Sequence, residues 1–243
     1  MTTARFECYG VPIELAADDA RTFRRMTARL PPAAQRLRSD GGAAAAADKP
    51  RRFRVRTPAD AAALQTFESK LALHFAAHAK ELLFVHAGVV GWRGRAILLP
   101  GRTHAGKSTL VAALVRAGAT YYSDEYALVT ADGRVLPYPR DLSLRRARGP
   151  VRVDPRRLGR VGRAPLPVGL VVLCRYGNRT ALEPLSPGRA VLALLKQTVA
   201  ARAQAATAME RLARIAMSAP VVAGTRGEAR PFARELLAGR HAS

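Results

Sequence analysis

The eight residues Gly101–Ser108, with the sequence GRTHAGKS, restrict the possible folds of this chain more than any other segment. They fit the pattern G-x-x-x-x-G-K-[S/T], in which glycines let a loop wrap around an anion and backbone N–H groups point at phosphates. An apolar run, AILLP, leads into the loop, and a helical pattern begins near Lys107 and ends at Gly118. The segment therefore predicts a strand, a phosphate-binding loop and a helix in succession.

The chemistry of this loop favours a nucleoside triphosphate with Mg²⁺. Lys107 would bring a full positive charge to the β and γ phosphates, and the Ser108 hydroxyl would bind Mg²⁺. Thr109 follows in the first turn of the helix. The expected nucleotide-binding residues are Gly101, Arg102, Thr103, His104, Ala105, Gly106, Lys107, Ser108 and Thr109.

A second candidate element is the acidic pair Asp124-Glu125, within ATYYSDEYALVT. We expect this run to be one strand, so neighbouring side chains would point to opposite faces and one carboxylate would dominate the site. Carboxylates shortly after a phosphate-loop helix can bind Mg²⁺ or accept a proton. The alternative is a solvated acidic turn, but only 18 acidic residues occur in the chain and this pair interrupts an apolar run.

The third candidate is His86, in LLFVHAGVV, one strand before the strand that leads into the loop. A histidine within an apolar strand is most often a satisfied core residue. If the two strands form a hairpin across the turn at Gly91–Gly94, however, His86 would stand beside the phosphate loop.

Together these elements resemble the catalytic domain of HPr kinase/phosphorylase, and more closely the HPr-kinase-related kinases of bacterial gene clusters, such as lasso-peptide clusters. The resemblance covers roughly residues 58–145 and is carried by FVHAGVV, GWRGRAILLPG, HAGKSTLVAALVRAG, YYSDEYALV and DGRVLPYPRDLSLR. It implies an α/β fold with a P-loop kinase core of the HPr kinase/phosphoenolpyruvate carboxykinase type. It also implies transfer of the ATP γ-phosphate to a serine hydroxyl. The family's phosphorylase-associated signature is missing from this chain, and DLSLRRARGP occupies that region instead.

The resemblance implies roles for individual residues. Asp124 matches the family's general base, and His86 matches the histidine that lies near that base. Lys107 matches the family's phosphate-binding lysine. Glu125 stands where the family has a second aspartate, so Ser108, Asp124 and Glu125 are the expected metal ligands. Arg140, which follows PYP, is a candidate contact for the acceptor or the phosphate; an ordinary surface arginine is an equally good interpretation.

These observations favour an ATP- and Mg²⁺-dependent kinase acting on a Ser or Thr hydroxyl of a peptide or small protein, for example a lasso-type precursor peptide. Two alternatives stay open: a kinase of a small-molecule alcohol or amino acid, and a nucleotide-binding regulatory protein without phosphotransfer. We expect no membrane partner, and a nucleic-acid partner is less favoured. A homo-oligomer is an open alternative.

The composition fits a globular protein, with 49% hydrophobic and 24% charged residues. The net charge of +22 comes from 40 Lys and Arg, of which 35 are Arg, against 18 Asp and Glu. Such a balance favours an acidic partner, although a GC-rich genome and a solvated arginine surface would produce it as well. The densest basic segment, 145–163, would form a solvated flap, a dock for an acidic peptide or a nucleic-acid patch, and it has no aromatic residues for base stacking.

Other residues exclude some classes of protein. Cys8 and Cys174 are too few and too far apart for a disulfide framework or a zinc site. No window of about 18 apolar residues would span a bilayer, so we expect a cytoplasmic protein. His74 and His78 have the i, i+4 spacing of metal ligands on a helix, but we expect ordinary packing because no third ligand is visible.

The chain is predicted to have a small N-terminal α+β extension with an Ala-rich connector in residues 1–50, followed by a P-loop kinase domain in residues 51–243. Expected elements outside the loop region are a hairpin over 4–15 and a helix over 18–30. A helix capped by Thr57 should run to about Lys80. A helical region over 187–217, continuous or divided in two, and a final helix near 232–238 complete the chain.

Overall fold

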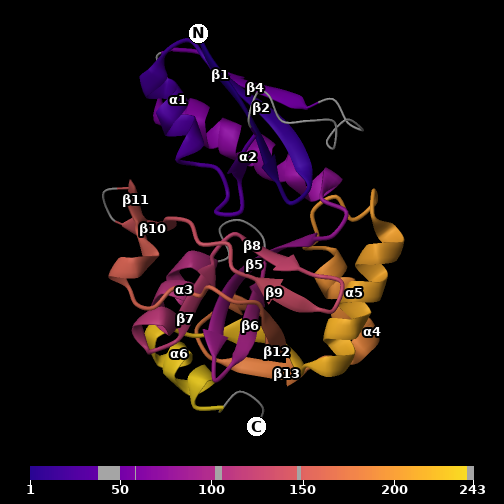
Figure 1. Cartoon of the computed structure of the whole chain (residues 1–243). Coiled ribbons are helices and arrows are strands. Elements are labelled where there is room, and N and C mark those ends of the chain that lie inside the picture. Colours follow the sequence, from indigo (N-terminus) through magenta and orange to yellow (C-terminus); the bar gives the residue numbers. More distant parts are fainter. Residues whose placement is uncertain (38–49, 58, 102–105, 147–148, 240–243) are drawn as a thin grey trace. The chain divides into compact units, whose positions relative to one another are not determined.

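The computed structural model describes residues 1–37, 50–57, 59–101, 106–146 and 149–239. It is a mixed α/β structure (Figure 1) that divides into two compact units, Met1–Leu82 and Leu83–Ser243. No helix within the described residues is both long enough and apolar enough to cross a membrane.

The first unit is a four-stranded sheet with two helices. Strands β1 (Thr2–Cys8) and β2 (Val11–Ala17) form the antiparallel hairpin that the alternating sequence predicts, turning at Tyr9 and Gly10, which both have positive φ. The sheet order is β3-β1-β2-β4. The remaining elements are β3 (Gln35–Arg36), β4 (Arg51–Val55), α1 (Ala20–Thr27) and α2 (Ala61–His78).

The boundary expected at residue 50 falls inside this unit. Strand β4 pairs in parallel with β2, from Ile13 opposite Arg51 to Ala17 opposite Val55. Helix α2 packs against β4, so the sheet and its covering helix both need residues beyond 50. Parallel pairing between segments about 40 residues apart is set by tertiary packing, and no local pattern marks it in the sequence.

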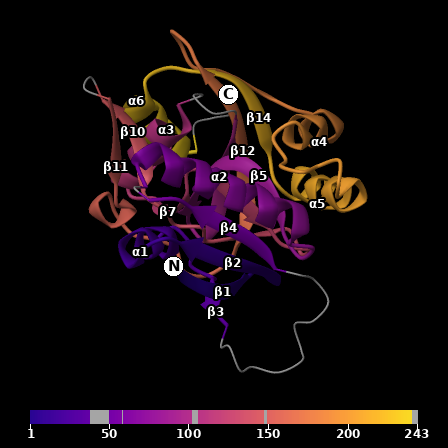
Figure 2. The same ribbon diagram turned by 90° about the horizontal axis from the view of Figure 1, so that it is seen from above.

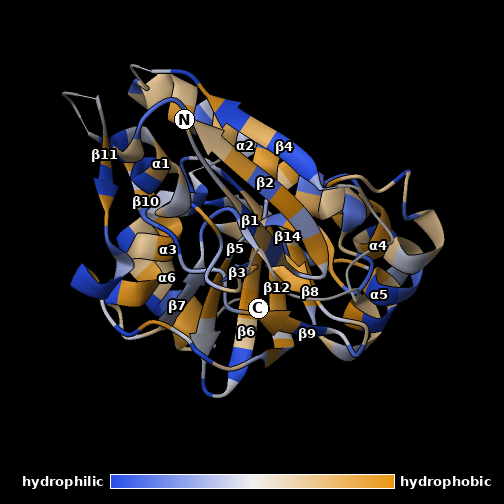
Figure 3. Ribbon diagram, turned by 45° about the horizontal axis from the view of Figure 1, so that its top comes forward, coloured by the Kyte–Doolittle hydropathy of each residue, from blue (hydrophilic) through white to orange (hydrophobic). Residues whose placement is uncertain are grey.

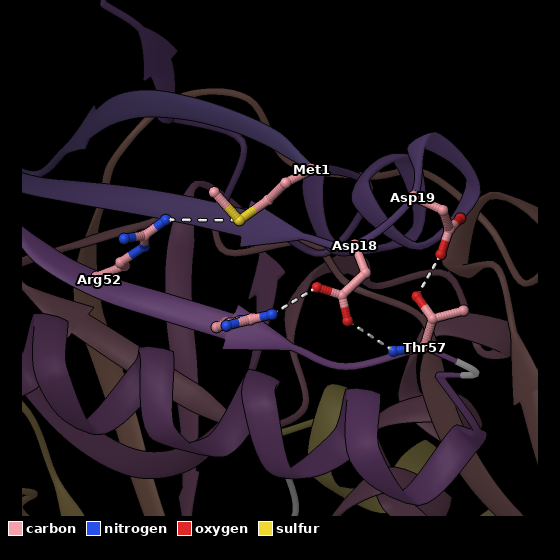
Figure 4. Close-up of polar contacts among 6 residues, drawn as sticks. Met1, Asp18, Asp19, Arg52 and Thr57 are labelled. Carbon is pink, nitrogen blue, oxygen red and sulfur yellow. Dashed lines mark hydrogen bonds and ion pairs between the residues drawn. The ribbon is translucent and has the colours of Figure 1, made fainter.

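The helices of this unit are capped by aspartates. The Asp19 carboxylate accepts a hydrogen bond of 2.8 Å from Thr22 N, and the Asp60 carboxylate accepts one of 2.6 Å from Ala63 N. The prediction that Thr57 caps α2 was therefore wrong. The Thr57 hydroxyl instead binds the Asp19 carboxylate, as Figure 4 shows, and this contact ties the entry of α2 to the start of α1.

The second unit is built on a sheet in the order β13-β14-β12-β6-β5-β8-β9, with β7 paired to β5. Strands β8, β9 and β12 are mostly apolar (Figure 3). The strands of the unit are β5 (Leu83–Trp92), β6 (Arg95–Pro100), β7 (Thr120–Ser123), β8 (Tyr126–Val129), β9 (Arg134–Leu136), β10 (Leu142–Arg146), β11 (Gly149–Val153), β12 (Leu166–Tyr176), β13 (Ala181–Pro184) and β14 (Val221–Arg226). Its helices are α3 (Lys107–Arg116), α4 (Pro187–Leu195), α5 (Ala205–Ser218) and α6 (Ala229–Leu237), with a 3-10 turn at Pro155–Arg157.

Two apolar cores lie on the two faces of this sheet. Alternate residues of β6 contribute to different cores: Ala96 and Leu98 pack with α4 and α5, whereas Ile97 and Leu99 pack with α3 and α6. Helices α4 and α5 lie side by side on their face (Figure 2). The helical region predicted over 187–217 is confirmed, and it is divided into these two helices.

Three neighbouring strands of the sheet run in parallel, and they position the candidate site. Strand β12 pairs in parallel with β6 on one side and with β14 on the other. Because the carboxyl ends of parallel strands meet at one edge of the sheet, the segments that follow Pro100, Tyr176 and Arg226 come together there.

Candidate functional site

The described part of the predicted phosphate loop has the expected strand–loop–helix context. Strand β6 ends at Pro100 and α3 begins at Lys107, preceded by Gly106 with φ +76°. That φ lies in the left-handed region, which favours glycine. Lys107 Nζ donates a hydrogen bond of 2.7 Å to the Gly101 carbonyl, so its ammonium group returns to the start of the loop. The predicted contacts Arg102, Thr103, His104 and Ala105 lie outside the described residues.

The acidic pair occupies a break between two strands, and the expectation of one continuous strand was wrong. Strand β7 ends at Ser123 and β8 begins at Tyr126. The buried Ser123 hydroxyl accepts hydrogen bonds from Glu125 N at 3.2 Å and Tyr126 N at 3.1 Å, which stabilises a turn at this point. Because the pleat is interrupted, the alternation argument does not apply to Asp124 and Glu125, and both carboxylates act on the ammonium of Lys107.

Asp124 is connected to the first turn of α3. Its carboxylate accepts hydrogen bonds from the Ser108 hydroxyl, from the Tyr121 hydroxyl at 3.2 Å, and from the backbone N–H of Ser143. Burial raises the pKa of Asp124 above its usual value, and these hydrogen bonds oppose the rise. Two of the three side chains expected on Mg²⁺, Ser108 and Asp124, are therefore already in contact.

Glu125 is a half-buried carboxyl group with a raised pKa. Burial, followed by the negative charge of Asp124, raises the pKa of Glu125 to about 7, while Arg152 and Lys107 act in the opposite direction. Burial also lowers the pKa of Lys107, and the two carboxylates oppose this change. The site is thus a partly desolvated cluster in which one carboxyl group exchanges its proton near neutral pH.

His86 lies where the predicted hairpin would place it. Strands β5 and β6 pair antiparallel, and the Gly101 N–H donates to the His86 carbonyl at 3.2 Å. The next residue of β5, Ala87, donates its N–H to the Glu125 carbonyl at 3.2 Å. The backbone at His86 and Ala87 therefore connects the start of the phosphate loop to the acidic pair.

The imidazole of His86 packs on Tyr126, with ring centroids 4.7 Å apart. Burial and the charge of Lys107 lower the pKa of His86. Its Nδ1 is buried and has no hydrogen-bond partner among the described residues. The backbone of Glu125 hydrogen-bonds to His86 and opposes this lowering of its pKa.

Arg140 contributes to the site through its backbone. Its carbonyl accepts a hydrogen bond of 2.8 Å from the Tyr121 hydroxyl, the same hydroxyl that donates to Asp124. Its guanidinium lies 5.7 Å from the centroid of the Tyr138 ring and donates to the Tyr138 hydroxyl at 3.1 Å. The predicted contact of this arginine with an acceptor or phosphate stays a prediction.

Three residues of this cluster were not expected from the sequence. Tyr121 precedes Asp124 by three residues, a spacing that would place the two side chains on opposite faces of the expected continuous strand, so the sequence did not suggest their contact. Arg152 belongs to the basic segment and lies opposite Ser143 in the β10–β11 hairpin. Arg226 approaches Gly106, with Nη2 3.4 Å from its carbonyl oxygen, but 120 residues separate the two and no local signal connects them.

His74 and His78, the histidines at i, i+4 on α2, pack against each other. His78 Nδ1 lies 2.8 Å from the His74 carbonyl, and the two rings are 4.3 Å apart. His74 is 7% exposed and also contacts Phe53 and Phe75.

Among the described residues, no group of three or more His, Cys, Asp or Glu side chains is arranged to hold a metal ion. Mg²⁺ in nucleotide sites usually needs only one or two carboxylates besides the phosphates.

Comparisons with known proteins give a distant structural likeness. No family model matches the sequence, and no curated protein matches it. The HPr(Ser) kinase/phosphatase from Coxiella burnetii is similar at 16% sequence identity and a TM-score of 0.40, over 65% of this chain and 95% of that chain. A likeness this distant does not assign the chain to a family, so its function has to be inferred from its own residues.

Proposed function

We propose that this chain is an ATP- and Mg²⁺-dependent kinase that transfers the γ-phosphate to a Ser or Thr hydroxyl of a peptide or small protein. The observation that carries the proposal is the contact of Ser108, in the first turn of α3, with Asp124 at the strand break. This contact joins the end of the phosphate loop to the acidic pair. Phosphoryl transfer needs both a phosphate cradle with its cation and a nearby carboxylate.

The residues present fit a magnesium nucleotide. The Ser108 hydroxyl and the Asp124 carboxylate are adjacent hard oxygen ligands, and Mg²⁺ prefers such ligands. The bound metal would neutralise charge on the β and γ phosphates. Lys107, whose ammonium already lies at the loop, would move from the Gly101 carbonyl to the phosphate oxygens.

A proton acceptor for the acceptor hydroxyl is the remaining requirement. The sequence-based hypothesis assigns this role to Asp124, with His86 orienting it. Glu125 is a second candidate for the same role, because its pKa of about 7 suits a general base and Asp124 is engaged with Ser108. In either assignment, the carboxylate takes the hydroxyl proton as the oxygen attacks the γ-phosphorus, and the bond from this phosphorus to the β,γ-bridging oxygen breaks to release ADP.

The β10–β11 hairpin supports an acidic acceptor. Leu142 and Leu144 are buried on one side, while Ser143, Arg145 and Arg152 alternate with them and are exposed. Arg152 also acts electrostatically on Glu125. A peptide with acidic residues near its Ser or Thr would meet this basic strand edge next to the carboxylates, and a lasso-type precursor is one candidate of this kind.

The test is incubation with γ-labelled ATP, Mg²⁺ and candidate peptides, compared with Lys107→Ala. Lys196→Ala, which removes an exposed lysine at the end of α4, is the matched control. We expect label on a peptide hydroxyl with wild type and Lys196→Ala, and loss of at least about 100-fold with Lys107→Ala because phosphate charge is no longer neutralised. Equal labelling by both lysine variants would contradict the proposal. Transfer only to free amino acids or alcohols would instead identify a small-molecule kinase.

A further inference from the structure

A pocket lies beside the first turn of α3, where β12 and β14 end. It has a volume of about 360 Å³. Ligands of open α/β sheets bind beyond the carboxyl ends of the parallel strands, and this pocket occupies that position. Its lining residues are Gly106, Thr109, Arg175, Tyr176, Arg226, Glu228 and Ala229.

The aromatic wall of the pocket is Tyr176, at the end of β12. Its side chain is 62% exposed, which is unusual for a large aromatic residue held in a defined position. The guanidinium of Arg226 lies 5.7 Å from its ring centroid, and its hydroxyl donates to Glu228 Oε1 at 2.7 Å. The ring is thus fixed by two contacts while much of its surface remains accessible, as a stacking platform requires.

Arg226 links this wall to the phosphate loop. The arginine is 4% exposed, and its Nη2 and Nη1 approach the carbonyls of Gly106 and Gly227 at 3.4 Å and 2.9 Å. A Cβ atom placed on Gly106 would lie 2.7 Å from Nη2, so the loop and the pocket wall are in direct contact. A ligand whose phosphates occupy the loop would extend into this pocket.

We propose that the pocket binds the nucleoside of the nucleotide, with the base stacked on Tyr176 and the ribose hydroxyls donating to Glu228. A volume of about 360 Å³ is within the range of small-ligand sites. A carboxylate is a suitable acceptor for vicinal sugar hydroxyls. The exposed Arg175 and the buried Arg226 line the same pocket and would offset the negative charge of Glu228 when phosphates are bound. This assignment rests on the proposed function, because it requires the loop to hold a nucleotide.

Calorimetric titration with ATP and with inorganic tripolyphosphate, both with Mg²⁺, tests the stacking. We expect Tyr176→Ala to weaken ATP binding by about 5- to 100-fold, the range for loss of one base–aromatic contact, and to leave tripolyphosphate binding unchanged. Tyr176→Phe, which keeps the ring and loses only the hydroxyl, should bind ATP nearly as wild type does. Unchanged ATP affinity in Tyr176→Ala, or equal weakening of both ligands, would overturn the inference.

The role of Glu228 is tested by changing the sugar of the nucleotide. Wild type should bind ATP about tenfold more tightly than 2′-deoxy-ATP, and Glu228→Ala should remove this preference. A preference that persists in Glu228→Ala would overturn the role of this carboxylate. Failure of the proposed function has a different signature: wild type would bind neither ATP nor tripolyphosphate, or Lys107→Ala would bind both as wild type does.

Discussion

Glu125 offers a direct test of the electrostatics of the site, through the stability of the second unit. Burial raises its pKa from 4.5 to about 7, so ionising it in the folded protein costs about 3 kcal/mol more than in the unfolded chain. The protonated group carries no such cost. The folded state is therefore penalised increasingly as the pH rises from about 4.5 to 7, and the full penalty applies above pH 7.

Glu125→Gln removes the ionisation and keeps the shape of the side chain. We expect the free energy of unfolding of the variant to exceed that of wild type by up to about 3 kcal/mol at pH 8, and to equal it within about 0.5 kcal/mol at pH 4. Hydrogen bonds to the lost carboxylate would reduce the gain. The increase with pH is the diagnostic feature, because a change in packing alone would not depend on pH.

Urea titrations between pH 4 and pH 8 measure this difference. Trp92 is the chain's one tryptophan and lies in β5, with Nε1 donating to the Leu237 carbonyl at 3.0 Å, so its fluorescence reports unfolding of the second unit. Glu183→Gln, which changes an exposed carboxylate of β13, is the matched control and should show no such trend. A difference between Glu125→Gln and wild type that stays constant from pH 4 to pH 8 would contradict the assigned cost of ionising Glu125.

Three further predictions concern core packing, the titration of a buried histidine and a helix cap. Gly88→Ala should lower the free energy of unfolding of the second unit by about 1–3 kcal/mol, because the new Cβ would lie 2.6 Å from Val111 Cγ2. The control in the same Trp92 assay is Gly188→Ala, whose new Cβ would have no atom within 4 Å. His74→Phe should remove an acid sensitivity of the first unit. Burial lowers the pKa of His74 to about 4, so the wild-type protein loses stability as the pH falls below 6.5. Hydrogen exchange of α2 at pH 5 and pH 7 should show this loss in the wild type and not in the variant. Asp60→Ala should destabilise α2 by about 1 kcal/mol through loss of its N-cap, seen as faster exchange at its first turn; unchanged exchange would show that the cap contributes little.

Local structure in the loop region followed directly from the sequence. The strand before Gly101, the helix from Lys107, and the hairpin that brings His86 next to the loop depend on consecutive residues. Apolar runs, turn glycines and a loop motif encode such elements within about 20 positions. For this reason the sequence alone could assign His86, Lys107 and the acidic pair to one region of the fold.

The strand break at Asp124 was not predictable in the same way. The run ATYYSDEYALVT has the composition of one continuous strand, and the break depends on hydrogen bonds to a single buried hydroxyl, that of Ser123. The break matters for the site, because the charges of both carboxylates, rather than of one, act on Lys107.

Contacts between distant segments arise only in the folded chain. Strand β4 joins β2 in the first unit, Arg152 comes to Glu125 from a basic segment, and Arg226 reaches Gly106 across 120 residues. The amino-acid pattern was sufficient to predict β6, α3 and the β5–β6 hairpin, because backbone conformation and hydrophobic periodicity are local properties. Strand order, burial and the resulting pKa values depend on which segments far apart in the chain pack together, so they are established by the folded protein.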